Sequence, residues 1–156
     1  MTRIPSATAL KAILEQAWLH VLAEEPSLFD YGRPVERPLV ARLAHYLSNE
    51  IENVDTSMWR GLTVDVDLHV GHGGMKPGVD ENAQYGQPDL VIHERATNAR
   101  NILVLEAKCN TNPTAGDMAK LDRIARQLGY RYTISVRLGR EPLDLHSLRR
   151  HAGTLG

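Results

Sequence analysis

The stretch QPDLVIHERATNARNILVLEAKCN, residues 87–110, decides the fold that the sequence predicts. Two apolar runs, 90–93 and 102–105, flank a polar segment that is rich in turn-forming residues, which is the pattern of a β-hairpin. Apolar residues occupy both parities of each run, so both faces of these strands are expected to be covered. The hairpin is therefore predicted to lie at the centre of a sheet with layers on both sides.

The position of the turn sets the register of this hairpin. If the turn is centred on residues 97–98, residues that pair across it have numbers that sum to about 195. Asp89 then lies opposite Glu106, at the open end of the hairpin. Side chains alternate along a strand, so Lys108 points the same way as Glu106 and Ala107 points into the opposite layer.

Two carboxylates side by side on neighbouring strands repel each other, and a divalent cation between them would remove that conflict. Mg²⁺ is often held by one or two carboxylates together with waters and a substrate phosphate. Lys108 would lie one strand step away, where it could orient a water or meet a phosphoryl oxygen. The alternative is a purely structural corner, in which Asp89 marks the strand entry and Glu106 forms a surface salt bridge with Lys108.

Pro88-Asp89 followed across a hairpin by Glu106-Ala107-Lys108 resembles the signature of the PD-(D/E)XK nuclease superfamily, which has the restriction-endonuclease-like fold. The core of that superfamily runs helix, three strands, helix, strand, and the elements expected between residues 35 and 138 have the same order. The resemblance implies an α/β fold with a mixed sheet flanked by helices. It also implies that Asp89, Glu106 and the Ala107 carbonyl bind Mg²⁺, for which Mn²⁺ could substitute.

A glutamate on the first core helix often completes the acidic cluster in this superfamily. The helix expected from about residue 35 to 51 offers Glu36 and Glu50, which both border its apolar stripe. Glu36-Arg37 opens the helix, as in small stand-alone members, so Glu36 is preferred over Glu50 as a catalytic and metal-binding residue. A first-turn acid that complements the helix dipole is the alternative for Glu36.

The remaining elements follow from periodicity and turn signals. A helix over 8–24 has an apolar stripe that must cover either the sheet or a second copy of the chain, with Ser6 or Thr8 as its N-cap. The other expected elements are a strand over 62–70, a helix over 117–128 that ends at Gly129, a last strand over 130–138 and a short helix over 143–151. Together they predict a single domain over 1–156, with an N-terminal helix at 7–24, the core at 35–138 and a tail at 139–156.

Several polar residues outside the hairpin are further candidates for the site. Asp65 and Asp67 form one face of the 62–70 strand and could approach the metal, although solvent-facing positions are the simpler interpretation. The glycine-rich loop 71–86 could wrap a phosphate backbone. Asp117 and Lys120 open the 117–128 helix beside the Glu106 strand, where helix capping and solvation are their simplest roles. The segment also resembles Asp-x-x-Lys-Leu segments that support the site in small nucleases of this superfamily.

Composition sets the limits of these interpretations. The 156 residues are 42% hydrophobic and 24% charged, with a net charge of -1, as in an ordinary globular protein. No apolar run is long enough to span a bilayer and no signal peptide is evident, so a cytoplasmic protein without membrane contact is expected. The single Cys109 excludes an internal disulfide and has no pattern of catalytic partners.

The charge is unevenly distributed. From residue 117 onward there are eight Lys and Arg against four Asp and Glu, whereas the first 116 residues have ten against fifteen. A basic C-terminal part could contact a nucleic-acid backbone beside an acidic metal centre. The expected partner is nucleic acid, with DNA preferred over RNA, and a homodimer is expected because paired sites can cut both strands of a duplex.

The sequence thus predicts a metal-dependent nuclease that hydrolyses phosphodiester bonds, with Asp89, Glu106, Lys108 and Glu36 as its catalytic residues. One alternative is an inactive module of the same fold that binds nucleic acid or a protein partner. A salt-bridge network in a structural interaction protein is the other.

Overall fold

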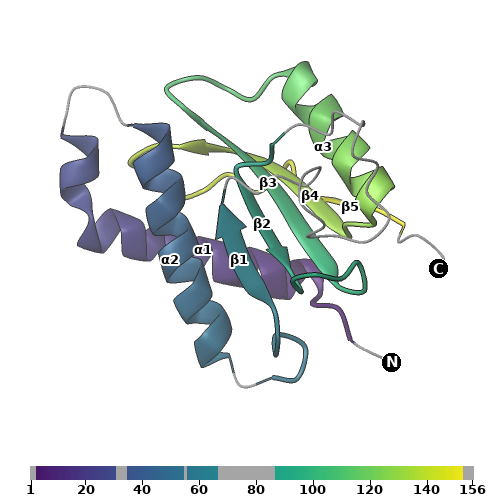
Figure 1. Cartoon of the computed structure of the whole chain (residues 1–156). Helices are drawn as coiled ribbons and strands as arrows, with labels where there is room; N and C mark the ends of the chain where they lie inside the picture. Colours follow the sequence, from purple (N-terminus) through teal and green to yellow (C-terminus); the bar gives the residue numbers. More distant parts are fainter. Residues whose placement is uncertain (1–2, 31–34, 55, 67–86, 153–156) are drawn as a thin grey trace.

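The computed structural model describes residues 3–30, 35–54, 56–66 and 87–152. Within these ranges a five-stranded mixed sheet is flanked by three α-helices (Figure 1). Helices α1 (Ala7–Glu24) and α2 (Glu36–Asn53) cover one face, and α3 (Ala115–Leu128) covers the other. The predicted α/β class with a mixed sheet is confirmed.

The sheet has the strand order β1-β2-β3-β4-β5. Its strands are β1 (Thr63–Val66), β2 (Leu90–His93), β3 (Asn101–Cys109), β4 (Tyr132–Leu138) and β5 (Arg149–Arg150). Strands β1, β2 and β3 pair antiparallel, β3 and β4 pair parallel with α3 as the crossover, and β4 pairs antiparallel with β5. The longest strand, β3, therefore lies in the middle and is buried on both faces over most of its length.

The predicted hairpin register is confirmed at the open end of β2 and β3, where Leu90 pairs with Leu105 and Val91 with Val104. The register shifts by one residue between Ile92 and His93, next to the turn. Because of this bulge, the consecutive residues Ile102 and Leu103 both face the core on the α1–α2 side. This change of register is confined to the turn end of the hairpin, so the pairing near Asp89 and Glu106 is not affected.

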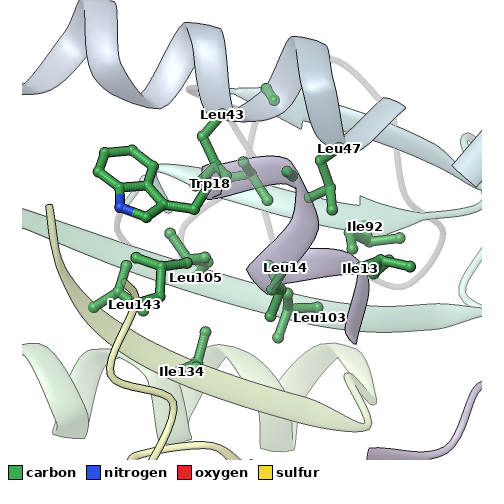
Figure 2. Close-up of a cluster of buried hydrophobic side chains, with 14 of the residues drawn as sticks. Ile13, Leu14, Trp18, Leu43, Leu47, Ile92, Leu103, Leu105, Ile134 and Leu143 are labelled. Carbon is green, nitrogen blue, oxygen red and sulfur yellow. The ribbon is translucent and has the colours of Figure 1, made fainter. Parts of the chain in front are cut away.

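The N-terminal helix covers the chain's own sheet. Ser6 caps α1 by accepting a hydrogen bond from the Ala9 amide at 3.1 Å. Its apolar stripe, including Leu14 and Trp18, is fully buried against α2 and the sheet (Figure 2). Of the two expected roles for this stripe, the structure supports burial within the chain, so the apolar face of α1 gives no argument for a homodimer.

Helix α3 closes the other face of the sheet. Thr114 and Asp117 form a capping box at its start, and Gly129 ends it in the left-handed conformation with φ of 73°. Its buried side chains pack on Val91 and Val104. Both boundaries come from local residue chemistry, which is why the sequence predicted this helix to within two residues at its start and at the same residue at its end.

Two predicted elements differ in the structure. Residues 143–151 do not form a helix: Leu143 and Leu145 are buried in a segment without regular secondary structure, and the Asp144 carboxylate accepts a hydrogen bond from the His146 amide at 3.0 Å. The chain then adds the short strand β5 beside β4, so the 130–138 strand is not the last one. The 62–70 strand is confirmed over Thr63–Val66, and residues 67–70 lie outside the described ranges.

In the described part of the chain, no helix has both the length and the apolar character needed to cross a membrane.

Burial of Trp18 is expected to contribute strongly to stability. The indole is fully buried, and its Nε1 donates to the Glu141 carbonyl at 2.9 Å. It packs edge to face on Phe29, with 6.1 Å between the ring centroids. Trp18→Ala should lower the free energy of unfolding by about 3–5 kcal/mol, or the Tm by roughly 6–20 °C, measured by thermal unfolding. Leu19→Ala, next to it but 45% exposed, is the control and should stay within about 0.5 kcal/mol of wild type.

Candidate functional site

The open end of the β2–β3 hairpin brings the two predicted carboxylates onto neighbouring strands. Asp89 immediately precedes β2, and its Oδ2 accepts a hydrogen bond from the Ala107 amide on β3 at 2.7 Å. Continuing the observed register places Asp89 opposite Glu106. Asp89 is therefore fixed against β3 by a backbone contact, and its negative charge acts on Glu106.

Glu106 is a buried acid, with 6% of its surface exposed. Its Oε2 lies 3.0 Å from Nζ of Lys120, which also donates to the Gln87 carbonyl at 2.8 Å. Burial raises the pKa of Glu106, and the charge of Asp89 acts in the same direction. Lys120 and Lys108 lower the pKa of Glu106 but do not cancel this shift. The ionised form of Glu106 therefore carries a desolvation cost, which a bound cation would reduce.

Lys108 points to the same side of β3 as Glu106, as predicted, and Ala107 lies in the core on the other side. Nζ of Lys108 lies 3.4 Å from Oδ1 of Asp117 in the capping box of α3. Partial burial would lower the pKa of Lys108, but Asp117, Glu106 and Glu36 together raise it. Lys108 is therefore a cation at neutral pH.

Asp117 and Lys120 do more than cap and solvate the helix. Capping is confirmed for Asp117, which also pairs with Lys108, whereas solvation is wrong for Lys120 because it binds Glu106. Helix α3 runs back along β3. Asp117, the first charged residue of the helix, therefore meets Lys108 near the end of the strand, and Lys120 meets Glu106 further back. The sequence carries this signal as a strand pattern Glu-x-Lys followed by a helix pattern Asp-x-x-Lys.

The two candidate acids of α2 lie in different surroundings. Glu36 opens the helix, and both it and Asp89 line a cavity of about 320 Å³ together with Val66. Glu50 lies near the other end of α2, where its Oε1 is 3.2 Å from Nε2 of His20. The start of α2 and the end of β3 meet at the same end of the sheet (Figure 1), so Glu36 is the α2 acid that borders the hairpin carboxylates.

Comparisons with family models, with curated proteins and with solved structures found no match. In the described ranges, no three or more His, Cys, Asp or Glu side chains are grouped closely enough to hold a metal ion. The close pair Asp89 and Glu106 is the remaining candidate, and two carboxylates are a sufficient protein contribution for Mg²⁺, which retains several waters.

The charge of the surrounding residues is consistent with such an ion. We call six residues the carboxylate cluster: Glu36, Asp89, Glu106, Lys108, Asp117 and Lys120. The cluster contains four carboxylates and two ammonium groups, and Arg37 lines the cavity that Glu36 and Asp89 share. The oxygen donors of Asp89 and Glu106 match the preference of Mg²⁺.

Asp65 takes no part in this cluster. Its carboxylate binds Nε2 of buried His93 at 2.7 Å and the Arg95 guanidinium at 2.8 Å, so the solvent-facing interpretation is wrong. Arg95 is the main cause that lowers the pKa of Asp65 to about 2. These contacts account for Asp65 as a structural ion pair. Asp67 and the 71–86 loop lie outside the described residues.

Cys109 is not a reactive thiol. It is half-buried against the core, and burial raises its pKa to about 11, with further contributions from Glu36 and Asp89. The thiolate is therefore disfavoured at neutral pH.

The raised pKa of Glu106 predicts how stability depends on pH. The folded chain binds a proton at Glu106 more tightly than the unfolded chain does, so its contribution to stability is lost as the pH rises from the ordinary value of 4.5 through the higher folded value. Glu106→Gln should avoid this loss. Without metal, its Tm at pH 7 should exceed that of wild type, and the difference should shrink toward pH 4.

Thermal unfolding between pH 4 and pH 8 in EDTA would measure this effect, with exposed Glu15→Gln as the control. A lower Tm for Glu106→Gln at pH 7 would show that the ion pair with Lys120 outweighs the cost of burying the carboxylate.

Proposed function

We propose that this chain is a metal-dependent nuclease of the PD-(D/E)XK superfamily, with the restriction-endonuclease-like fold. The observation that carries the proposal is the register of β2 and β3, which brings Asp89 beside Glu106 with Lys108 one step further on the same face. The order α2, β1, β2, β3, α3, β4 supports it, because helix, three strands, helix, strand is the order of that core.

In this proposal Asp89, Glu106 and the Ala107 carbonyl bind Mg²⁺, and Mn²⁺ can replace it. Glu36 joins the ion directly or through a water, from the start of α2. Bound there, the ion supplies a Lewis acid for a phosphoryl oxygen and lowers the pKa of a coordinated water. Burial of Glu106 and the backbone contact of Asp89 hold both carboxylates in place before substrate arrives.

Lys108 has an electrostatic role in this proposal. Its raised pKa keeps it charged, so it stabilises negative charge on the phosphate and orients a water, and it does not remove a proton from that water. Asp117 fixes the ammonium group through their ion pair, and Asp117 is itself fixed by the capping box. Lys120 opposes the rise in the pKa of Glu106 and also binds the Gln87 carbonyl.

A specific observation favours a second candidate function. The ion pairs Lys108–Asp117 and Lys120–Glu106 already engage four members of the carboxylate cluster without a metal. A chain with this network could be an inactive module that binds nucleic acid or a protein. Metal-dependent cleavage and metal-dependent stabilisation separate the two candidates.

Cleavage is the direct test. The purified chain should cut supercoiled plasmid DNA or labelled single-stranded DNA or RNA with Mg²⁺ or Mn²⁺, and not in EDTA. Asp89→Ala and Lys108→Ala should each lower the rate about 100-fold or more, because each removes charge stabilisation from the transition state.

Glu36→Gln and Glu50→Gln form a matched pair in the same helix. Only Glu36→Gln should reduce cleavage, since Glu50 pairs with His20 away from the cluster. Cutting that persists in EDTA or in Asp89→Ala would contradict the proposal. No cutting of any substrate, with unchanged nucleic-acid binding in all variants, would favour the inactive module.

Metal binding should also be visible without any substrate. An ion that binds only the folded chain adds about 2.7 kcal/mol of stability at 100 times its Kd, so Mg²⁺ or Mn²⁺ should raise the Tm. Asp89→Asn should abolish the increase and Glu50→Gln should preserve it. Equal shifts in both variants would place the bound ion elsewhere.

A further inference from the structure

A second charged site lies at the other end of the sheet. A cavity of about 560 Å³ is lined by Arg3 near the N-terminus, Arg131 before β4 and Arg150 in β5. The other lining residues are Ile4, Pro5, Ser6, Ala7, Met58 and Tyr132, and none of them is acidic. We call this the arginine pocket.

The arginine pocket brings together segments that are far apart in the chain, and several contacts fix them. The Tyr132 hydroxyl donates to the Pro5 carbonyl at 3.1 Å, which holds the segment after Arg3 against the start of β4. The Arg131 amide donates to the Asn101 carbonyl at 3.0 Å, and its carbonyl accepts from the His151 amide at 2.8 Å. Arg150 lies beside Tyr132 in the β4–β5 pairing.

None of the three arginines forms an ion pair with any residue that the structure describes. Other arginines of the chain do have acidic partners: Arg42 pairs with Glu25, Arg140 with Asp30 and Arg149 with Asp122. Three guanidinium groups around one cavity repel one another, and an anion bound between them would remove that repulsion.

The backbone around the pocket adds to its positive potential. Ser6 and Ala7 begin α1, whose first turn contains no acidic residue to balance the positive end of the helix dipole. This contribution supports the arginines and would not define a site without them.

We infer that the arginine pocket binds phosphate groups of a nucleic-acid backbone, at a place separate from the carboxylate cluster. The inference rests on the proposed function in one respect, which is that the phosphates are those of nucleic acid. Guanidinium groups match phosphate oxygens in geometry and charge, and they supply affinity without reading sequence.

The two sites lie at different levels along the strands and on different faces of the sheet. Ser135 pairs with Glu106 across β3 and β4, and Arg131 lies four residues earlier in the chain, so the levels differ by roughly 13 Å at about 3.3 Å per residue. Glu106 faces α3, whereas Tyr132 and the start of α1 at the arginine pocket lie on the opposite face. The arginine pocket is therefore a site separate from the carboxylate cluster.

Binding measured in EDTA tests the inference without cleavage. Fluorescence anisotropy of a labelled 20-nucleotide strand and of its duplex would be recorded over a range of salt concentrations for wild type and for Arg3→Gln/Arg131→Gln/Arg150→Gln. We expect at least a tenfold rise in Kd. The slope of log K against log salt should fall by about 2–3 on the duplex, since each lost contact removes about 0.9.

Two further variants separate the pocket from total charge and from folding. Arg123→Gln/Arg140→Gln removes cations elsewhere on the surface and should keep a slope within about one of wild type. Arg3→Gln/Arg150→Gln changes only the two exposed side chains and should lower the slope by about two, even if Arg131→Gln destabilises the chain. The triple Arg→Lys variant should retain the wild-type slope.

An unchanged slope in the triple Gln variant, or a wild type that binds neither strand nor duplex, would overturn the inference. Inorganic phosphate at millimolar concentration is the second probe. If phosphate raises the Tm of wild type but not of the triple Gln variant while no oligonucleotide binds, the pocket takes free phosphate and the nucleic-acid assignment is wrong.

The outcomes also separate this inference from the proposed nuclease. If the wild type binds nucleic acid through the three arginines but does not cleave it, the inference about the arginine pocket stands and the proposed nuclease activity is wrong. If cleavage depends on Asp89 while binding does not depend on the three arginines, the nuclease proposal stands and the inference about the arginine pocket is wrong.

Discussion

The structure depends on the antiparallel pairing of β2 with β3. This pairing places one carboxylate from each strand at the same end of the sheet, and the hydrogen bond from the Ala107 amide to Asp89 extends the contact beyond the last paired residue of β2. Both strands are buried on two faces, so their side chains cannot exchange faces without exposing core residues. Burial of the apolar residues therefore fixes the positions of the charged ones.

Helix α3 supplies the ion-pair partners of the charged residues at this end of the sheet. An unpaired buried carboxylate is costly, and Glu106 is stabilised by Lys120, while Lys108 is held by the Asp117 that also caps the helix. The capping of α3 and the electrostatics of the carboxylate cluster thus share the residue Asp117. The close approach of the Asp89 and Glu106 carboxylates is the basis for proposing a cation there, and the arginine pocket carries charge of the opposite sign.

The sequence predicted those features that depend on neighbouring residues or on strict periodicity. The hairpin register followed from the centre of its turn, the side of Glu106 and Lys108 from strand alternation, and the end of α3 from Gly129. It did not predict partners that only the packed fold brings together, such as Lys120 with Glu106 or Asp65 with His93 and Arg95. The 143–151 segment was misread because its two buried leucines are also compatible with an extended chain.

The bulge at the turn end of the hairpin has a consequence for how this chain can vary. The bulge inserts one additional residue of β3 opposite β2, and it changes the strand register only within a few positions of the turn. A change of one residue in the length of the turn can be taken up there, by gain or loss of the bulge, while the open end keeps its pairing. The turn between 95 and 99 can thus change in length by one residue, whereas an insertion between Asp89 and Ile92 or between Leu103 and Glu106 would separate the two carboxylates.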